Sequence, residues 1–225
     1  MAGEGGRQEG TRGVPGMSKD DLPALEGGRP VRERMLPYGR HELDEADIQA
    51  VVEVLRGEWL TNGPTVARFE QAFAEAVGAT FAVAFSSGTA ALHAAAFAAG
   101  IGPGDEVITS PLTFLASANC LLYCGARPVF ADIDPATLNL DPAKVQAALS
   151  PRTRAILPIH FAGLPCPMDA IHAIARSRTL AVIEDAAHAL GAEWDGRRIG
   201  SASDLTTFSF HPVKHITTGE GGMVT

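Results

Sequence analysis

Lys214 is the residue of this chain best placed for covalent chemistry. The 225 residues include three lysines, at positions 19, 144 and 214. Only Lys214 has apolar and aromatic neighbours in the sequence, in the segment Phe208–Lys214. Removing an amine from water lowers its pKa, which leaves more of the neutral form to attack a carbonyl carbon. Lys214 is therefore a candidate for Schiff-base formation.

Asp185 places a carboxylate ahead of that lysine. It ends an apolar run, Leu180–Glu184, that reads as a buried strand. In open α/β sheets, ligands bind beside the carboxyl ends of the strands. A strand-end carboxylate followed by a lysine on a later loop is the pattern of a pyridoxal-phosphate site, where the carboxylate keeps the pyridine nitrogen protonated. An ordinary strand followed by a solvated lysine, or a helix-capping Asp185, explains the same residues.

A candidate anion site lies at Ser87-Gly88-Thr89, between a predicted strand and an alanine-rich helix. The amides and the dipole of a helix N-terminus attract phosphate. Gly88 lets a phosphate approach the backbone, and the hydroxyls of Ser87 and Thr89 can add hydrogen bonds. A plain Ser/Thr helix cap is the alternative. The nucleotide motifs G-x-x-x-x-G-K-[ST] and G-x-G-x-x-G are absent from the sequence, so a nucleotide is not the obvious occupant.

Four more residues complete the candidate site. Phe114 follows the second predicted strand, where its ring would stack on a flat cofactor or pack in the core. Ala187 lies two positions after the carboxylate and is small enough to pack on a ring face. His188 would hydrogen-bond the ring hydroxyl or lie at the surface. Ser209, on the last strand before the lysine, would reach the phosphate.

From residue 80 onward, predicted strands alternate with helices. The strands are Phe81–Phe85, Glu106–Thr109, Arg127–Asp132, Ala155–His160 and Leu180–Glu184. The helices are 88–99, 113–124, 141–149 and 167–177. This alternation predicts an α/β fold with βαβ units and a mostly parallel sheet flanked by helices. An Asp-Gly turn is expected to join two further short strands, 192–197 and 204–210.

The chain divides into three predicted regions. Residues 1–34, rich in Gly, Arg, Glu and Pro, read as a disordered leader. Residues 35–79 form a helical segment, with one helix capped by Asp44 and a second ended by Gly78. Residues 80–225 form the large domain, which we expect to be truncated because the chain stops in a strand that has barely begun. Such a fragment should expose apolar surface and aggregate.

Composition excludes several classes of protein. The 18 basic and 26 acidic side chains give a net charge of −8, which argues against a nucleic-acid-binding surface. No apolar run reaches the roughly 18 residues of a membrane span, and residues 1–20 lack the apolar core that a signal peptide needs. Three cysteines without a Cys-x-x-Cys pair argue against disulfides or structural zinc and suit the cytoplasm.

Taken together, these segments resemble the DegT/DnrJ/EryC1/StrS family of sugar aminotransferases, which are fold-type I pyridoxal-phosphate enzymes with a seven-stranded large domain. The resemblance covers residue 36 to the end. The matching segments are Trp59–Pro64, Ser87–Leu92, Glu184–Gly191, Phe208–Lys214 and Gly219–Gly222. Within the family, Phe-His-Pro-Val-Lys followed by Ile-Thr-Thr is similar to the pseudaminic-acid branch, which aminates C4 of a UDP-linked 4-keto-6-deoxy-N-acetylhexosamine.

The resemblance assigns roles to the candidate residues. It implies that Lys214 carries the cofactor as a Schiff base and shuttles the proton to the sugar carbon, with glutamate as the usual amino donor. It also implies that Asp185 pairs with the pyridine nitrogen. The remaining assignments are phosphate binding by Gly88, Thr89 and Ser209, ring stacking by Phe114, and contact with the ring oxygen by His188. Ala187 would pack on the ring.

The sequence departs from the family in length. Family members continue well beyond residue 225, adding a small C-terminal domain, and they act as homodimers in which each active site borrows residues from the partner. Two other readings therefore remain open. One is an inactive fragment or a non-catalytic paralogue. The other is a fold-type I enzyme acting on amino acids, such as a lyase or a decarboxylase.

Overall fold

The structure, a computed structural model, describes residues 18, 20–37 and 39–225. The chain divides into two compact units, Met1–Arg40 and His41–Thr225. In the first unit, the described residues form one short 3-10 helix, η1 (Ala24–Glu26), with no buried side chain. Much of the predicted disordered leader, residues 1–17 and 19, lies outside the described residues. Disorder of the leader therefore stays a prediction.

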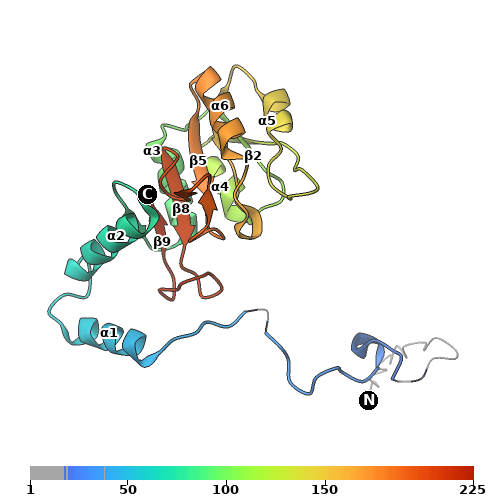
Figure 1. Cartoon of the computed structure of the whole chain (residues 1–225), viewed down its shortest axis with the longest axis vertical. Helices are drawn as coiled ribbons and strands as arrows, with labels where there is room; N and C mark the ends of the chain where they lie inside the picture. Colours follow the sequence, from blue (N-terminus) through green and yellow to red (C-terminus); the bar gives the residue numbers. More distant parts are fainter. Residues whose placement is uncertain (1–17, 19, 38) are drawn as a thin grey trace, which may run out of the picture. The chain divides into compact units, whose positions relative to one another are not determined.

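The second unit is built on a seven-stranded sheet (Figure 1). The strands are β1 (Val83–Phe85), β2 (Glu106–Thr109), β3 (Arg127–Phe130), β4 (Thr153–Leu157), β5 (Ala181–Asp185), β8 (Leu205–Ser209) and β9 (Gly222–Val224). Their order across the sheet is β1-β9-β8-β5-β4-β2-β3. All neighbouring pairs from β8 to β3 are parallel, and only β9 runs antiparallel to its neighbours. The predicted α/β fold with a mostly parallel sheet is confirmed.

Apolar residues on successive positions of the central strands face opposite layers of the molecule. In β4, Ala155 and Leu157 belong to one buried cluster and Ile156 belongs to another. The first cluster includes residues of α3 (Gly88–Ala98) and α4 (Leu115–Tyr123). The second includes residues of α5 (Pro142–Ala148) and α6 (Met168–Arg178). Burial on both faces explains why these strands are continuous apolar runs in the sequence.

The helices before the sheet differ in how they are packed. α2 (Pro64–Val77) begins with proline and ends at Gly78 in the left-handed conformation. Its Phe73 packs edge-on against Phe208 and Phe210, with ring centroids 5.0 Å and 5.4 Å away. α1 (Glu45–Arg56) has the predicted Asp44 cap in a complete capping box, and none of its residues is buried. Both predicted helices are therefore present.

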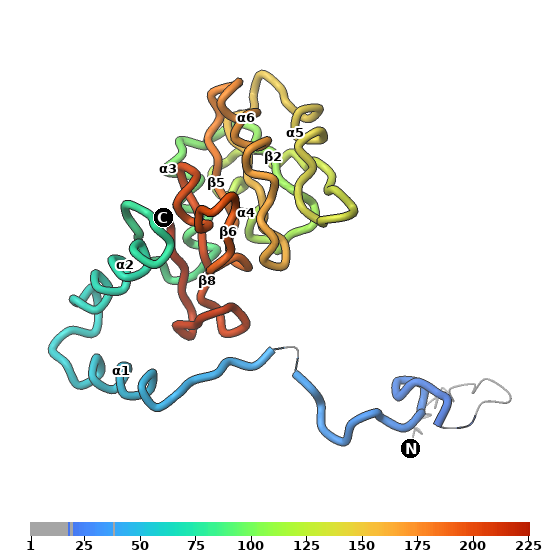
Figure 2. The backbone as a smooth tube through the Cα atoms, viewed as in Figure 1, coloured from blue at the N-terminus to red at the C-terminus, as the bar shows by residue number. Residues whose placement is uncertain are grey.

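The last segment of the chain forms a strand that is paired on both sides. β9 lies between β1 and β8, so that Gly222 pairs with Phe85 on one side and Ser209 on the other. The main sheet of the described residues has seven strands, the number that the family resemblance implies. Figure 2 shows this red C-terminal segment beside β8 and close to α3. The helix α3 contacts both β8 and β9. A strand that looks barely begun in the sequence is held from both sides.

The predicted role of the Asp-Gly turn is also corrected. Asp195 and Gly196 have φ values of 49° and 70° and join β6 (Glu193–Trp194) to β7 (Arg197–Arg198) in a separate hairpin. Two positive φ values suit a two-residue hairpin turn, which pairs the strands on either side of it. β8 instead joins the main sheet beside β5.

Several large apolar side chains remain at the surface of the second unit. They include Phe81, Phe97, Leu115, Tyr123 and Phe130, each more than half exposed. Phe81 was expected inside the first strand, which begins only at Val83. Aggregation of the chain stays a prediction. Among the described residues, no helix has both the length and the apolar character needed to cross a membrane.

Candidate active site

Asp185 ends β5 with its backbone fixed on both sides. Its N–H donates to Pro158 O (2.9 Å), and its carbonyl accepts from His160 N (3.1 Å). The next residue, Ala186, donates to Thr207 O (2.8 Å) across the neighbouring strand β8. Asp185 is 5% exposed. The sheet therefore delivers a buried carboxylate at the carboxyl ends of β5 and β8, as the sequence predicts.

Two donors bind the two oxygens of that carboxylate. The Ser117 hydroxyl donates to Oδ2 at 2.6 Å, and the backbone N–H of Ala187 donates to Oδ1 at 3.1 Å. Thr113 Oγ1 lies 2.7 Å from Ser117 Oγ. The sequence reasoning missed Ser117. A signal was available, because Ser117 follows Thr113 by four residues and would lie on the same side of the predicted helix 113–124.

Lys214 lies on the loop after β8, half-buried, with its N–H bonded to His211 O at 2.8 Å. Burial lowers the pKa of the Lys214 amine below its ordinary value, and the Asp185 carboxylate partly opposes this change. Burial also lowers the pKa of His188, to which the positive charge of Lys214 adds. The three side chains are thus near enough to influence one another electrostatically, although they come from two different loops.

The predicted anion site has the form of a helix N-terminus. Ser87 caps α3, and its Oγ accepts from Ala90 N at 3.1 Å. This is the alternative role foreseen for Ser87, whose lone pair is directed at the helix. The amides of Gly88 and Thr89 belong to the first turn, where N–H groups have no intrahelical acceptor. The N-terminus of α3 therefore offers N–H groups that can bind an anion.

Ser209, at the end of β8, packs directly against Gly88. A Cβ atom built on Gly88 would lie 2.8 Å from Ser209 Cβ and 3.1 Å from its Oγ. A carbon–carbon contact of 2.8 Å is too short to persist, so a larger residue at position 88 would force α3 and β8 to shift apart. The structure thereby brings together two residues 121 positions apart, 209 − 88, that were both predicted to bind phosphate.

The structure places Phe114 at the N-terminal boundary of α4, with 74% of its surface exposed. The alternative of a core phenylalanine is therefore wrong. Its ring is available at the same helix start that carries Thr113 and Ser117. Ala187 and His188 are both half-buried, and the His188 ring approaches Phe161 edge-on with centroids 6.4 Å apart.

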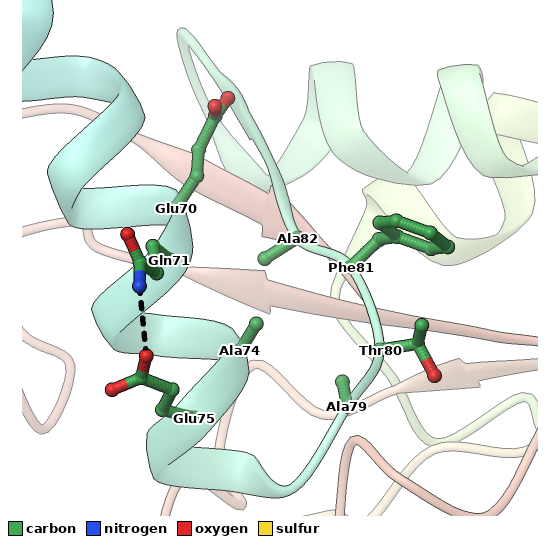
Figure 3. A pocket seen from close by; sticks show the side chains of 8 residues that line it. All are labelled: Glu70, Gln71, Ala74, Glu75, Ala79, Thr80, Phe81 and Ala82. Carbon is green, nitrogen blue, oxygen red and sulfur yellow. Dashed lines mark hydrogen bonds between the residues drawn. The ribbon is translucent and has the colours of Figure 1, made fainter.

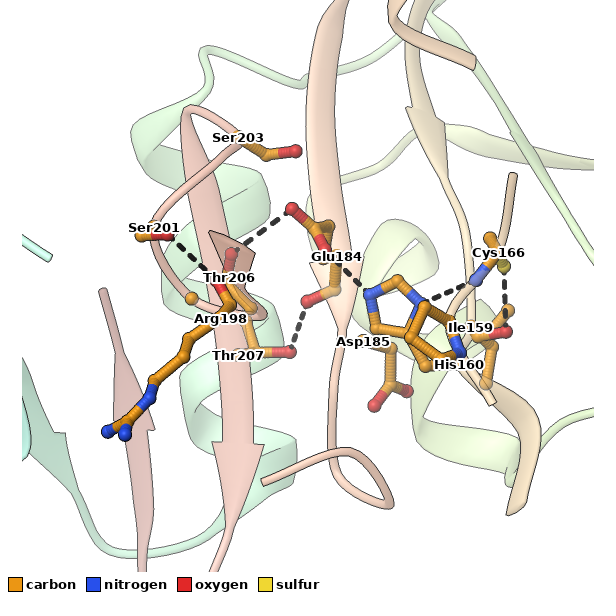
Figure 4. A network of polar contacts seen from close by, with 12 residues as sticks. Ile159, His160, Cys166, Glu184, Asp185, Arg198, Ser201, Ser203, Thr206 and Thr207 are labelled. Atoms are coloured by element: carbon orange, nitrogen blue, oxygen red, sulfur yellow. Dashed lines mark hydrogen bonds and ion pairs between the residues drawn. The ribbon is translucent and has the colours of Figure 1, made fainter. Parts of the chain in front are cut away.

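His160, just after β4, is a buried structural residue and does not line an open pocket. It is fully buried, and its Nε2 lies 2.6 Å from Glu184 Oε2 (Figure 4). The backbone N–H of Cys166 donates to His160 Nδ1 at 3.0 Å, so Nε2 is the nitrogen that carries the proton toward the carboxylate. The Thr206 hydroxyl of β8 donates to Glu184 Oε1 at 3.4 Å, and the Thr207 hydroxyl donates to the backbone carbonyl oxygen of Glu184 at 3.0 Å. This network ties β5 to the strands on both sides.

A separate hollow lies between α2 and the segment that follows it (Figure 3). Its lining consists of Glu70, Gln71, Ala74, Glu75, Ala79, Thr80, Phe81 and Ala82. It contains none of the predicted site residues. Glu70, in this lining, has a structural hydrogen bond, because its Oε1 accepts from Ala84 N at 2.8 Å. The candidate site at the strand ends is therefore separate from this hollow.

The sequence profile of the DegT/DnrJ/EryC1/StrS aminotransferase family matches residues 41–225. The chain belongs to this family. Among curated relatives, GDP-perosamine synthase of Caulobacter vibrioides is 51% identical over 184 residues, which are 81% of this chain and 50% of that protein. The chain spans about half the length of the curated relatives it matches.

Solved structures of family members share the fold. Spr1654 of Streptococcus pneumoniae, in its PLP form, has a TM-score of 0.82 and 34% identity, covering 84% of this chain and 52% of that one. PseC of Helicobacter pylori, an aminotransferase involved in the biosynthesis of pseudoaminic acid, has a TM-score of 0.81 and 34% identity, covering 85% and 52%. These similarities place the described sheet within a fold-type I aminotransferase.

Proposed function

We propose that this chain forms the cofactor-binding part of a pyridoxal-phosphate-dependent aminotransferase that acts on a nucleotide-linked keto sugar. One observation carries the proposal. Asp185 ends β5, and Lys214 lies on the loop that follows β8, the parallel neighbour of β5. The N-terminus of α3 meets the end of the same β8 at the contact between Gly88 and Ser209. An amine, an acid and an anion-binding site thus lie at the same edge of the sheet.

The residues present fit a phosphorylated pyridine. The absence of a Cβ at Gly88 leaves the helix amides close to the Ser209 hydroxyl, which is the donor set a phosphate requires. The buried Asp185 supplies an acceptor for a protonated ring nitrogen. We assign binding of the phosphate to Gly88, Thr89 and Ser209. The residues assigned to the ring are Asp185, Phe114, Ala187 and His188.

The chemistry of the bound cofactor is that of an electron sink, which stabilises the charge left when a proton leaves the carbon beside the reacting nitrogen. Lys214 has two tasks in the chain's own chemistry. Its lowered pKa keeps more of Nζ neutral, so that it can attack a carbonyl carbon. Once the amine of the amino donor has displaced it from that carbon, the same nitrogen is free to take a proton from the substrate carbon and return it. Asp185 remains an acceptor throughout, fixed by its hydrogen bonds from Ser117 and Ala187.

The substrate class follows from the family and its members. We infer a sugar nucleotide with a 4-keto-6-deoxy hexose that is aminated at C4, with glutamate as donor and a homodimer as the working assembly. The sequence around Lys214 favours the UDP-linked, pseudaminic-acid branch. The 51% identity to GDP-perosamine synthase raises a GDP-linked sugar as the competing substrate, and the experiment includes both.

The first test is cofactor binding by the 225-residue chain. We expect a visible absorption band on addition of pyridoxal phosphate, and borohydride should bleach the band and fix the cofactor to Lys214, as located by peptide mass spectrometry. Lys214→Ala should abolish both results. Lys144→Ala, at an exposed position on α5, is the matched control and should change neither. Labelling that is equal in the two variants would refute the assignment of Lys214.

The second test addresses the reaction. The chain is incubated with pyridoxal phosphate, ¹⁵N-glutamate and either a UDP-linked or a GDP-linked 4-keto-6-deoxy sugar, and the sugar is analysed for ¹⁵N. Incorporation into the UDP-linked sugar alone supports the pseudaminic-type assignment, and incorporation into the GDP-linked sugar alone overturns it. Cofactor binding without transfer to either sugar would limit the function of these residues to binding pyridoxal phosphate.

A further inference from the structure

The backbone of Asp185 is fixed by the sheet, but its side chain is not. Hydrogen bonds to Pro158 O and from His160 N hold its main chain on one side, and the bond from Ala186 N to Thr207 O holds the next residue on the other. Two torsions, χ1 and χ2, remain to decide where the carboxylate points. The bond from Ala187 N to Oδ1 is local, because only two residues separate the partners. Such short-range bonds form readily in turns and give little tertiary control.

The bond from Ser117 supplies the tertiary control. Ser117 is fully buried on α4 and reaches Asp185 Oδ2 at 2.6 Å across 68 residues of sequence. Its single hydroxyl proton is used in this bond, because a carboxylate only accepts. The proton between Thr113 Oγ1 and Ser117 Oγ therefore belongs to Thr113. The direction of both bonds follows: Thr113 donates to Ser117, and Ser117 donates to Asp185.

We propose that Ser117, itself oriented by Thr113, is a positioning residue that fixes the Asp185 carboxylate for the ring nitrogen of the cofactor. The part of this statement that concerns the cofactor rests on the function proposed above. A hydrogen bond to a charged acceptor is about twice as strong as one between neutral groups. Loss of the Ser117 hydroxyl should let the Asp185 side chain rotate and should weaken cofactor binding about tenfold.

The surroundings of Ser117 agree with a dedicated hydroxyl. Cys120, one turn later on α4, donates its thiol hydrogen to Ser117 O at 3.3 Å. Burial, with a contribution from the Asp185 charge, raises the pKa of Cys120 to about 12, so the thiol stays neutral. Among the described residues, Ser117 is the side chain recorded as a hydrogen-bond partner of the Asp185 carboxylate.

The direct test is made without cofactor. Three-bond ¹⁵N–¹³Cγ and ¹³C′–¹³Cγ couplings report the χ1 rotamer of Asp185 in the labelled 225-residue chain. We expect one rotamer in the unchanged chain and averaged couplings in Ser117→Ala. The matched control is Thr109→Val, which removes a buried hydroxyl bonded to Leu157 O at 2.9 Å and does not touch Asp185. It should keep a single Asp185 rotamer while lowering the urea midpoint to a similar extent.

Thr113→Val removes only the outer, half-buried hydroxyl and is the second variant should Ser117→Ala not fold. It should produce partial averaging of the same couplings. The proposal is overturned if Asp185 is already averaged in the unchanged chain. It is also overturned if Ser117→Ala folds and its Asp185 couplings equal those of Thr109→Val. If Ser117→Ala does not fold, the same comparison is made with Thr113→Val.

Titration with pyridoxal phosphate separates this proposal from the proposed function. Ser117→Ala should bind about tenfold more weakly than Thr109→Val, with the visible band of the bound cofactor altered. If Asp185→Asn binds pyridoxal phosphate as tightly as the unchanged chain, the role assigned to Asp185 is refuted. The coupling measurements then decide separately whether Ser117 fixes the Asp185 rotamer. If the Asp185 couplings of Ser117→Ala equal those of Thr109→Val while Asp185→Asn no longer binds the cofactor, only the role of Ser117 is refuted.

Discussion

Replacement of Gly88 by alanine tests how the two halves of the candidate phosphate site are joined. Two effects oppose each other. Alanine is favoured over glycine within a helix by up to about 1 kcal/mol, and Gly88 is the first residue of α3. The added Cβ would lie 2.8 Å from Ser209 Cβ, whereas carbon atoms pack at about 3.5–4.0 Å. The two elements would therefore have to separate by about 1 Å.

Ser209 cannot retreat easily, because it pairs with Gly222 of β9 and the next residue, Phe210, is bonded to Gly221 O. Overpacking of this kind costs about 1–3 kcal/mol. The net effect of Gly88→Ala should thus be a loss of about 1–2 kcal/mol in the free energy of unfolding. Binding of pyridoxal phosphate should weaken as well, since the helix amides move away from the Ser209 hydroxyl.

The assay is urea denaturation followed by circular dichroism. Gly102→Ala is the control, because no atom lies within 4 Å of the added Cβ and Gly102 is not in the left-handed region. It should change stability by no more than about 0.5 kcal/mol. The double variant Gly88→Ala/Ser209→Gly removes the closest opposing atoms and should recover at least about 1 kcal/mol of the loss. The reasoning is refuted if Gly88→Ala is as stable as Gly102→Ala, or if the double variant shows no coupling.

Three further predictions concern charged groups. Hydrogen bonds from two arginines and a serine lower the pKa of Glu106 from 4.5 to about 2. The unfolded chain therefore binds more protons between these pH values, so stability should fall as pH falls through this window, and Glu106→Gln should flatten the slope in acid-denaturation curves. His160→Leu should cost about 3–5 kcal/mol in urea denaturation, because it leaves the Glu184 carboxylate buried without its partner, and a cost under 1 kcal/mol would contradict the pairing. Because burial lowers the pKa of Lys214, the rate of its acylation should have a pH midpoint below 10.5. Mass spectrometry measures the acylation, with Lys144 as the internal standard for the reagent, and a midpoint at or above 10.5 would contradict this.

Much of the fold could be predicted because it depends on local pattern. Buried parallel strands are continuous apolar runs, and the helices between them begin at recognisable caps such as Ser87. The element types were predicted correctly, and most boundaries moved by one to three residues. The pairing of β9 could not be predicted, because its three residues are held by the two neighbouring strands and not by a local pattern of their own.

The sequence by itself determined which chemistry is available: one lysine in an apolar setting, one carboxylate at a strand end, and a glycine at a helix start. These depend on residue type and short-range spacing, which the sequence states directly. Only the tertiary structure decided which groups meet. It buried His160 against Glu184, set Ser209 on Gly88, and brought Ser117 to Asp185. Contacts between residues tens of positions apart depend on strand order and on the packing of helices over the sheet, and no local pattern encodes either.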